Sequence, residues 1–358
     1  MSDAPTYYFI LPDIDRPIGG VNVLLHYIDM LNAAGYRAAP LYGSAHQSYK
    51  FAPCSARSFY SDALRATTRK SMGRRAKLAA LPADLVVLGQ NPVNAPLQRK
   101  PSDVYIIPEY LYPELFDLFP EARRILAVQD VFGFFRSFTR DTARERPAIG
   151  RFDAIFTTSE ASHRAVQSVV EGAPYRLTLS VERPGLHYRQ DKKLQIAYMP
   201  RKRKDDAKII VNALKNRADM ADVTFLAIEN VAEDALQSIL GESLRFMSLS
   251  SQEGFGLPPA EALSAGCLVV GYTGVGGDEY FTSDVAFPIQ DSDLVTFIET
   301  VRAVIGEYKA DPTRLDRMRK AASAQILEKY NAAQAETNLL TAWAGIHQQL
   351  TGCTTGSA

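Results

Sequence analysis

The chain has 358 residues, about the length of two domains, and 46% of them are hydrophobic, which excludes a small module and a disordered chain. Its 40 basic residues balance its 40 acidic residues, so no overall field attracts nucleic acid and no nucleic-acid partner is expected. The three scattered cysteines fit neither a disulfide framework nor a zinc site, and no apolar run reaches the roughly 20 residues that span a bilayer. We therefore expect a cytoplasmic protein.

Short apolar segments alternate with amphipathic helical patterns along the chain. Near-continuous apolar strands followed by helices are what a parallel sheet covered on both faces requires. The pattern predicts an α/β protein with doubly wound, Rossmann-like sheets. The expected strands lie in 6–12, 83–89, 103–109, 124–130, 154–160, 176–181, 194–200, 223–230, 244–251 and 267–272.

A single polar stretch, 182–193, interrupts this alternation and contains Pro184 and Gly185. We interpret it as a linker between a first domain, 1–186, and a second domain, 187–330. The remaining segment, 331–358, holds one more helical pattern and a polar end. We expect its helix to cross back to the first domain and its end to fray.

Two segments are unusually basic. The segment 57–77 has seven basic residues and one acid, with Phe59, Tyr60, Leu64 and Met72 interleaved. It is either an ordinary solvated helix or a peripheral contact with an anionic membrane at its inner face. The second cluster, 201–206, follows an expected strand of the second domain, at the end of a parallel strand where such folds bind anions.

The segment 253–266 carries the most specific pattern. Pro258 and Pro259 are tolerated only in the first turn of a helix, so a helix begins there, and Gly266 ends it. Gly254 and Gly256 allow the backbone before this helix to approach a ligand closely. The N–H groups of the loop and of the new helix would then form a cradle for a phosphate.

Glu253 and Glu261 flank this cradle. A carboxylate beside a phosphate needs hydrogen-bond donors, and sugar or ribose hydroxyls supply them. Each glutamate alone has a structural explanation, because Glu261 complements the helix dipole and Glu253 is a solvated loop residue. Together with the cradle, however, the two carboxylates favour a nucleotide sugar as ligand.

The nine residues from Glu253 to Glu261, Glu-Gly-Phe-Gly-Leu-Pro-Pro-Ala-Glu, resemble the signature of the retaining glycosyltransferases of family four, which have the GT-B fold. The layout agrees at Gly19-Gly20, at 158–160, at 183–185 and at the basic cluster. The resemblance implies two Rossmann-like domains that face a central cleft, with the acceptor held by the first domain, 1–186, and the nucleotide-sugar donor mainly by the second, 187–330. It also implies retaining, metal-independent transfer of a sugar from a nucleoside-diphosphate sugar to a hydroxyl of a sugar, glycan or lipid-linked acceptor, in polysaccharide or glycoconjugate biosynthesis.

The resemblance also implies roles for individual residues. Glu253 would lie near the transferred sugar, Glu261 would bind the nucleotide ribose, and an arginine with a lysine would clamp the diphosphate. We assign the clamp to Arg201 and Lys204, with Lys202 and Arg203 as rivals. The other expected donor-binding residues are Gly19, Gly20, Asp130, Gly254, Phe255, Gly256 and Leu257.

The chain departs from the family pattern at three places. It reads Met-Pro-Arg at 199–201 where many relatives have Gly-Arg, Gln129-Asp130 where many have His-Asp, and Gly-Val-Gly-Gly-Asp-Glu at 274–279 where many have Gly-Gly-x-Pro-Glu. Two other functions stay open. They are a sugar-nucleotide epimerase or phosphorylase on the same architecture, and a nucleotide-sugar-binding protein without turnover.

Neither a metal nor another cofactor is expected. The Asp-x-Asp spacings at Asp13 and Asp15 and at Asp291 and Asp293 are common by chance, and we interpret both as surface loops.

Overall fold

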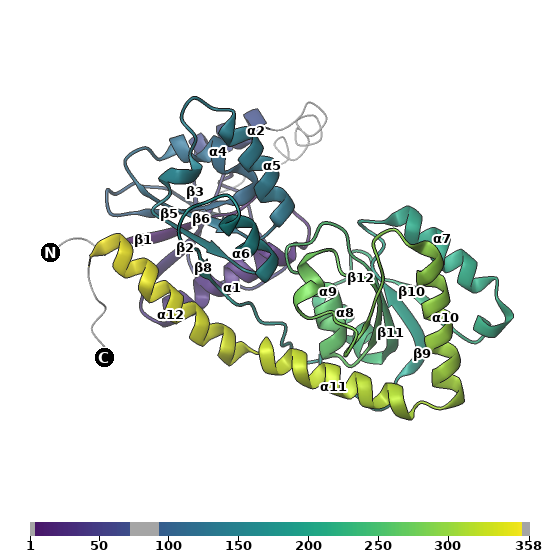
Figure 1. Cartoon of the computed structure of the whole chain (residues 1–358). Coiled ribbons are helices and arrows are strands. Elements are labelled where there is room, and N and C mark those ends of the chain that lie inside the picture. Colours follow the sequence, from purple (N-terminus) through teal and green to yellow (C-terminus); the bar gives the residue numbers. More distant parts are fainter. Residues whose placement is uncertain (1–3, 72–92, 353–358) are drawn as a thin grey trace. The chain divides into compact units, whose positions relative to one another are not determined.

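The computed structural model describes residues 4–71 and 93–352. Internal contacts divide the chain into two compact units, and Figure 1 shows their elements. The first unit comprises Met1–Thr157, His163–Leu177 and Asn338–Ala358, and the second comprises Thr158–Ser162 and Thr178–Thr337. The expected α/β class with two Rossmann-like sheets is confirmed.

The first unit contains a parallel sheet of eight strands in the order β4-β3-β2-β1-β5-β6-β7-β8. The order runs outward from β1 in both directions, as in a doubly wound fold, so all the strands end at the same edge. The strands are β1 (Thr6–Ile10), β2 (Arg37–Tyr42), β3 (Phe59–Tyr60), β4 (Ala95–Pro96), β5 (Val104–Pro108), β6 (Arg123–Val128), β7 (Ala154–Thr157) and β8 (Tyr175–Arg176). The helices are α1 (Gly19–Ala33), α2 (Asp62–Ser71), α4 (Tyr112–Leu115), α5 (Val131–Thr142) and α6 (Glu160–Gln167), with 3-10 turns η1 (Glu109–Leu111), η2 (Phe116–Leu118) and η3 (Ile149–Arg151).

The second unit contains a parallel sheet of five strands in the order β10-β9-β11-β12-β13. The strands are β9 (Lys193–Tyr198), β10 (Thr224–Ala227), β11 (Ser243–Leu249), β12 (Leu268–Tyr272) and β13 (Phe287–Pro288). The helices are α7 (Lys204–Lys215), α8 (Glu233–Glu242), α9 (Leu257–Ser264), α10 (Leu294–Ala310) and α11 (Thr313–Lys329), with 3-10 turns η4 (Ala218–Met220) and η5 (Gly276–Glu279).

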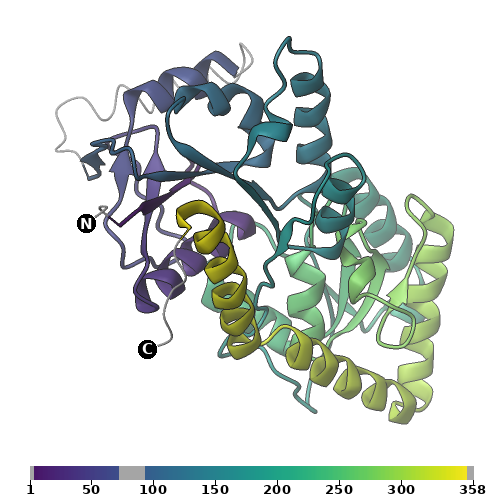
Figure 2. The same ribbon diagram turned by 60° about the vertical axis from the view of Figure 1, so that its left-hand side comes forward.

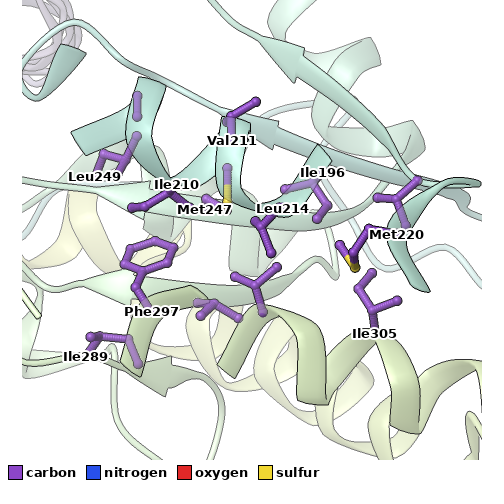
Figure 3. Close-up of a cluster of buried hydrophobic side chains, with 14 of the residues drawn as sticks. Ile196, Ile210, Val211, Leu214, Met220, Met247, Leu249, Ile289, Phe297 and Ile305 are labelled. Carbon is purple, nitrogen blue, oxygen red and sulfur yellow. The ribbon is translucent and has the colours of Figure 1, made fainter. Parts of the chain in front are cut away.

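A continuous apolar core fixes the sheet of the second unit against α7 and α10, as Figure 3 shows. Ile210 and Leu214 lie one turn apart on α7 and are fully buried, as is Phe297 of α10. Met247 and Leu249 of β11 point to the same side, because alternate residues of a strand share a face. This core holds the ends of β9, β11 and β12 in a fixed relation.

The last helix, α12 (Ala332–Thr351), starts in the second unit and continues in the first (Figure 1). Trp343, the one tryptophan of the chain, is fully buried there, with its ring stacked 5.7 Å from Phe9 and edge-on to Tyr7 at 5.1 Å. His347 Nδ1 is 2.5 Å from Tyr7 Oη. Figure 2 shows the helix in yellow beside the strands that it covers.

Apart from the short segment Thr158–Ser162, the second unit begins at Thr178, before the boundary expected after residue 186. The segment 178–186 packs within the second unit. Its Val181 N–H donates to Tyr330 O at 2.9 Å, and Arg183 Nε is 3.2 Å from Glu233 Oε1.

Two expected strands need comment. The expectation for 176–181 was wrong, because only Arg176 of this segment belongs to a strand and the rest is the buried connection between the units. The expected strand at 83–89 lies outside the described residues. Among the described strands, β2, β3, β4 and β13 were not expected, and β2 contains Pro40, a residue that is unusual in a central strand. It is tolerated because β3 pairs only with Leu41 and Tyr42.

Candidate functional site

The candidate donor site lies in the second unit, where three loops follow the carboxyl ends of β9, β11 and β12. These strands are neighbours in the parallel sheet, so their following loops lie at one edge. The loops contain residues 199–203, 250–256 and 273–280. The basic cluster, the two-glutamate motif and the unusual 274–279 segment therefore meet at one edge.

Two of these loops are joined by backbone hydrogen bonds. Glu253 N–H donates to Gly274 O at 2.9 Å, and Gly276 N–H donates to Glu253 O at 3.1 Å. A Cβ at Gly276 would lie 2.4 Å from the carbonyl carbon and oxygen of Gly254, so no other residue fits without a shift of the backbone. The segment 274–279, which differs from the sequence pattern of the resembled family, thus holds the loop 250–256, here called the motif loop, in place.

The motif loop carries four N–H groups that could face an anion, those of residues 254–257. None of the four donates a hydrogen bond to another group within the described ranges. Gly256 has a φ of +84°, the left-handed conformation that glycine favours, and α9 begins at Leu257. Pro258 and Pro259 follow and have no N–H groups. The helix itself therefore offers fewer donors than the sequence suggested, and the loop amides make up most of the cradle.

A buried tyrosine supports this loop from below. Tyr280 Oη donates to Phe255 O at 3.2 Å and to Gly256 O, and burial raises the pKa of its hydroxyl well above the usual value. The rings of Phe255 and Tyr280 lie 5.0 Å apart, and Tyr330 packs edge-on to Phe255 at 5.1 Å. The carbonyls of the loop thus point inward to Tyr280. Because two carbonyls are held, the conformation of the loop is set before a ligand arrives.

The four basic residues of 201–206 have different surroundings. Lys202 Nζ lies 2.9 Å from Glu253 Oε1 and donates to the carbonyls of Ser251 and Gln252 at 3.1 and 3.3 Å. Arg203 pairs with Asp206 at 3.0 Å and with Asp291, and its guanidinium lies 4.7 Å from the centre of the Tyr272 ring. Arg203 is therefore bonded within the fold, whereas the ammonium of Lys202 contacts the motif loop, residues 250–256.

Arg201 and Lys204, the two residues assigned to the clamp, are both exposed. Arg201 lies in the turn after β9, and Lys204 is the first residue of α7. Both are close in sequence to Lys202, which contacts the motif loop. Their assignment to a diphosphate clamp is a proposal.

Glu261 lies within α9 and is 9% exposed. The pKa of its carboxyl is raised to about 7, mainly by burial; the positive charge of Arg183 opposes the rise, and the negative charge of Glu233 adds to it. No group in the described part of the chain donates a hydrogen bond to this carboxylate. A largely buried carboxylate is stabilised by hydrogen-bond donors, which solvent or a ligand can supply here.

The first unit places a second group of expected residues together, at the carboxyl edge of its own sheet. Gln129 Nε2 donates to Gly20 O at 3.2 Å, and a Cβ at Gly20 would lie 3.1 Å from Gln129 Oε1. Gly19, the first residue of α1, adjoins this contact. Asp130 caps α5, since its side chain accepts a hydrogen bond from Phe132 N–H at 2.9 Å. One carboxylate oxygen of Asp130 therefore already accepts a hydrogen bond within the fold.

Glu109 is a residue of this edge that the sequence analysis did not select. It follows β5, is 5% exposed and accepts a hydrogen bond from Gln129 N–H at 3.3 Å. Burial raises the pKa of its carboxyl to about 8, and the nearby charge of Asp130 adds to the rise. The sequence does contain a signal for this residue, because Glu109 is an acidic residue directly after an apolar strand.

Within residues 4–71 and 93–352, no cluster of three side chains that could hold a metal ion is found. Asp13 accepts hydrogen bonds from the N–H groups of Gly43 and Ser44, and Asp293 caps α10. These aspartates thus have structural roles. In the same ranges, no helix has the length and hydropathy needed to cross a bilayer.

No family model matches the chain. A sequence relative is an α-1,6-glucosyltransferase of Actinobacillus pleuropneumoniae serotype 7 (strain AP76), which is 26% identical over 124 residues. The match covers 34% of this chain and 38% of that relative.

Solved structures are similar over almost the whole chain. A variant of S. aureus TarM in complex with fondaparinux, α-GlcNAc-glycerol and UDP has a TM-score of 0.67 at 9% identity, covering 96% of this chain and 99% of that one. Sucrose-phosphate synthase of Thermosynechococcus elongatus has a TM-score of 0.67 at 12% identity, with the same coverage. Anabaena HepE in complex with UDP has a TM-score of 0.58 at 12% identity, covering 95% and 100%. The fold is that of the GT-B glycosyltransferases.

Proposed function

We propose that this chain is a glycosyltransferase that moves a sugar from a nucleoside-diphosphate sugar to an acceptor hydroxyl, in polysaccharide or glycoconjugate synthesis. The observation that carries this proposal is Glu261, a largely buried residue whose carboxylate receives no hydrogen bond within the described ranges, on the helix that follows four loop amides that donate to no group in those ranges. Ribose hydroxyls would satisfy the carboxylate, and phosphate oxygens would satisfy the amides.

The names of the similar proteins agree with this proposal. The sequence relative is a glucosyltransferase, and two of the similar structures were solved with UDP. The TarM complex also holds α-GlcNAc-glycerol, a glycosylated polyol. These likenesses support a nucleotide-sugar donor for this chain, while the choice of nucleotide and sugar is a matter for the assay below.

The leaving diphosphate would be stabilised mainly by positive charge from the second unit. As the bond to the anomeric carbon breaks, charge develops on the leaving oxygen, and donors that are already in place stabilise it without reorganisation. We assign this role to the loop amides and to Arg201, and to Lys202 or Lys204. The contacts of Lys202 favour it over Lys204, because its ammonium already lies on the motif loop.

Glu253 would orient the transferred sugar. Its carboxylate now pairs with Lys202, so donor binding would exchange that partner for sugar hydroxyls and free the ammonium for the diphosphate. We further propose that the acceptor attacks from the face that the diphosphate leaves, with retention of configuration, and that no metal ion is needed because the protein supplies the positive charge.

One experiment separates this function from its alternatives. The protein is incubated with a panel of nucleotide sugars, with and without glucan and polyol acceptors, and the release of the nucleoside diphosphate is measured. Release that depends on acceptor supports a transferase, interconversion of the donor sugar indicates an epimerase, and binding without release indicates a carrier. The first-formed product is analysed by nuclear magnetic resonance, and an inverted anomeric linkage would overturn the retaining mechanism.

We also propose that the basic segment 57–77 contacts an anionic membrane. Residues 72–77 of this segment lie outside the described residues. Within the described part, Leu64 is 1% exposed and Phe59 and Tyr60 are half-buried in β3. These three side chains pack within the fold, so we propose an electrostatic contact through residues such as Arg57 and Lys70. Binding to anionic vesicles should then be lost at high salt, and equal sedimentation with neutral vesicles at low salt would contradict it.

A further inference from the structure

A groove of about 830 Å³ lies in the first unit, between α2 on one side and η1, α4 and α5 on the other. Its size is within the range of about 300–1,000 Å³ that is usual for small-molecule sites. Thr67 and Lys70 come from α2, while Tyr110, Glu114, Arg140 and Arg144 are among the residues of the opposite side. No role has been assigned to this groove above.

The two arginines of the groove are held in fixed positions. Arg140 Nε lies 3.0 Å from Glu114 Oε1, and its Nη2 donates to Tyr110 O at 3.0 Å. Arg144 Nη1 donates to Pro113 O at 2.8 Å, and its Nη2 pairs with Asp117. Each guanidinium is thus bonded to both a carboxylate and a backbone carbonyl, so little side-chain entropy remains to be lost on binding.

The charges of the groove nearly balance. Its lining has three cations, Lys70, Arg140 and Arg144, and two carboxylates, those of Glu114 and Asp117. A site for a phosphate or a sulfated chain would offer arginines without carboxylate partners. Alternating donors and acceptors instead match groups that both donate and accept, which are hydroxyls. The half-exposed ring of Tyr110 adds an apolar face beside them.

The groove begins at the edge of the sheet where Glu109 and Gln129 lie. Tyr110 follows Glu109 directly, at the carboxyl end of β5. Burial raises the pKa of its hydroxyl, and the charges of Glu109 and Asp13 add to the rise. One residue therefore joins the groove to the candidate site of the first unit.

We propose that this groove binds the acceptor as an extended, uncharged, hydroxyl-rich glycan, with several sugar units along the Arg140–Glu114 and Arg144–Asp117 pairs. This inference rests on the proposed glycosyltransferase function. It assigns to the enzyme an oligosaccharide or polysaccharide acceptor, in preference to a monosaccharide or an anionic chain.

The test blocks the groove in the full chain. Thr67→Trp places a large ring in it, and Thr139→Trp is the matched control. Thr67 and Thr139 each lie on a helix and donate to the carbonyl four residues earlier at 3.0 Å, but Thr139 does not line the groove. Isomaltooligosaccharides of one to six glucose units are the neutral probes, and a heparin-derived pentasaccharide is the anionic probe. Binding is measured by saturation-transfer nuclear magnetic resonance, alongside UDP binding by thermal shift.

We expect the affinity for neutral probes to rise with chain length, to fall about tenfold or more in Thr67→Trp, and to stay within about twofold in Thr139→Trp. UDP binding should be the same in all three proteins. Tighter binding of the anionic probe, equal losses in both variants, or no binding of any neutral probe would overturn the acceptor groove. Absence of UDP binding in the unaltered protein would instead count against the proposed function itself.

Discussion

Replacing Glu261 with glutamine should make the second unit more stable and the donor less tightly bound. The carboxyl of Glu261 has a pKa of about 7 in the fold against 4.5 in an unfolded chain. That difference corresponds to a free energy on the order of 3 kcal/mol. The protonated carboxyl is the form that the fold favours, so its contribution to stability is complete below pH 4.5 and is lost as the pH rises through 7. Glu261→Gln stays uncharged, and its gain in stability should therefore appear at pH 8 and vanish near pH 4.5.

The same carboxyl should make donor binding depend on pH in the opposite direction. Ribose hydroxyls donate best to the ionised form, which is half populated at pH 7 and about one-tenth populated at pH 6, so the affinity for UDP should fall roughly fivefold between these values. In Glu261→Gln the affinity should be weaker at pH 8 and nearly independent of pH. Because ribose contacts are alike in the ground and transition states, KM should change more than kcat.

Two measurements check this reasoning. Amide hydrogen exchange of α9 reports the local stability, with α1 of the first unit as an internal reference, and isothermal titration with UDP reports the affinity at pH 6, 7 and 8. Glu233→Gln is the control, because it removes a neighbouring charge and should move the pH midpoint downward without abolishing it. UDP affinity that is independent of pH in the unaltered protein, or a glutamine variant that binds UDP equally well at pH 8, would refute the assignment of Glu261.

Three further predictions concern the lysines near the motif loop, the glycine that packs against it, and the need for a metal ion. Lys202→Ala should lower kcat by a factor on the order of 100 to 1000 and Lys204→Ala by less, because the Lys202 ammonium contacts the motif loop; the reverse order in steady-state kinetics would return the clamp to Lys204. Gly276→Ala should abolish UDP binding, since its Cβ would lie 2.4 Å from the Gly254 carbonyl, whereas Gly306→Ala in α10, with nothing within 4 Å, should keep binding and raise thermal stability by up to about 1 kcal/mol. Activity should survive EDTA, and complete loss with rescue by Mn²⁺ would contradict a metal-independent reaction.

The backbone of the motif loop could be predicted from the sequence because the rules that determine it are local. Two prolines can occupy only the first turn of a helix, and Gly256 marks the left-handed residue before it, so the positions of Glu253 and Glu261 follow from a few neighbours. The ranking of the four basic residues could not be predicted in this way. It depends on Asp291, which lies 88 positions from Arg203 in the sequence and binds its guanidinium.

The first unit was harder to predict, because its features come from sheet order. Glu109 and Gln129 meet only because β5 and β6 are neighbours, and the groove exists only because α2 lies opposite α5. The strand β2 was missed since its proline and alanines have weak strand propensity, and burial against β1 outweighs that preference. Non-local contacts decided these positions, and a single sequence does not display them.

The shared helix α12 bears on how the chain folds during synthesis. Trp343 fills the centre of the first unit, yet it is translated after all the strands of the second. On the ribosome, the strands of the first unit would emerge with an open apolar core, whereas the second unit can assemble as soon as α11 has emerged. Folding should therefore proceed against the direction of synthesis. A nascent chain that stops before residue 338 would contain a folded second unit and a first unit with an incomplete core. We expect chaperones to bind that first unit in preference to the second.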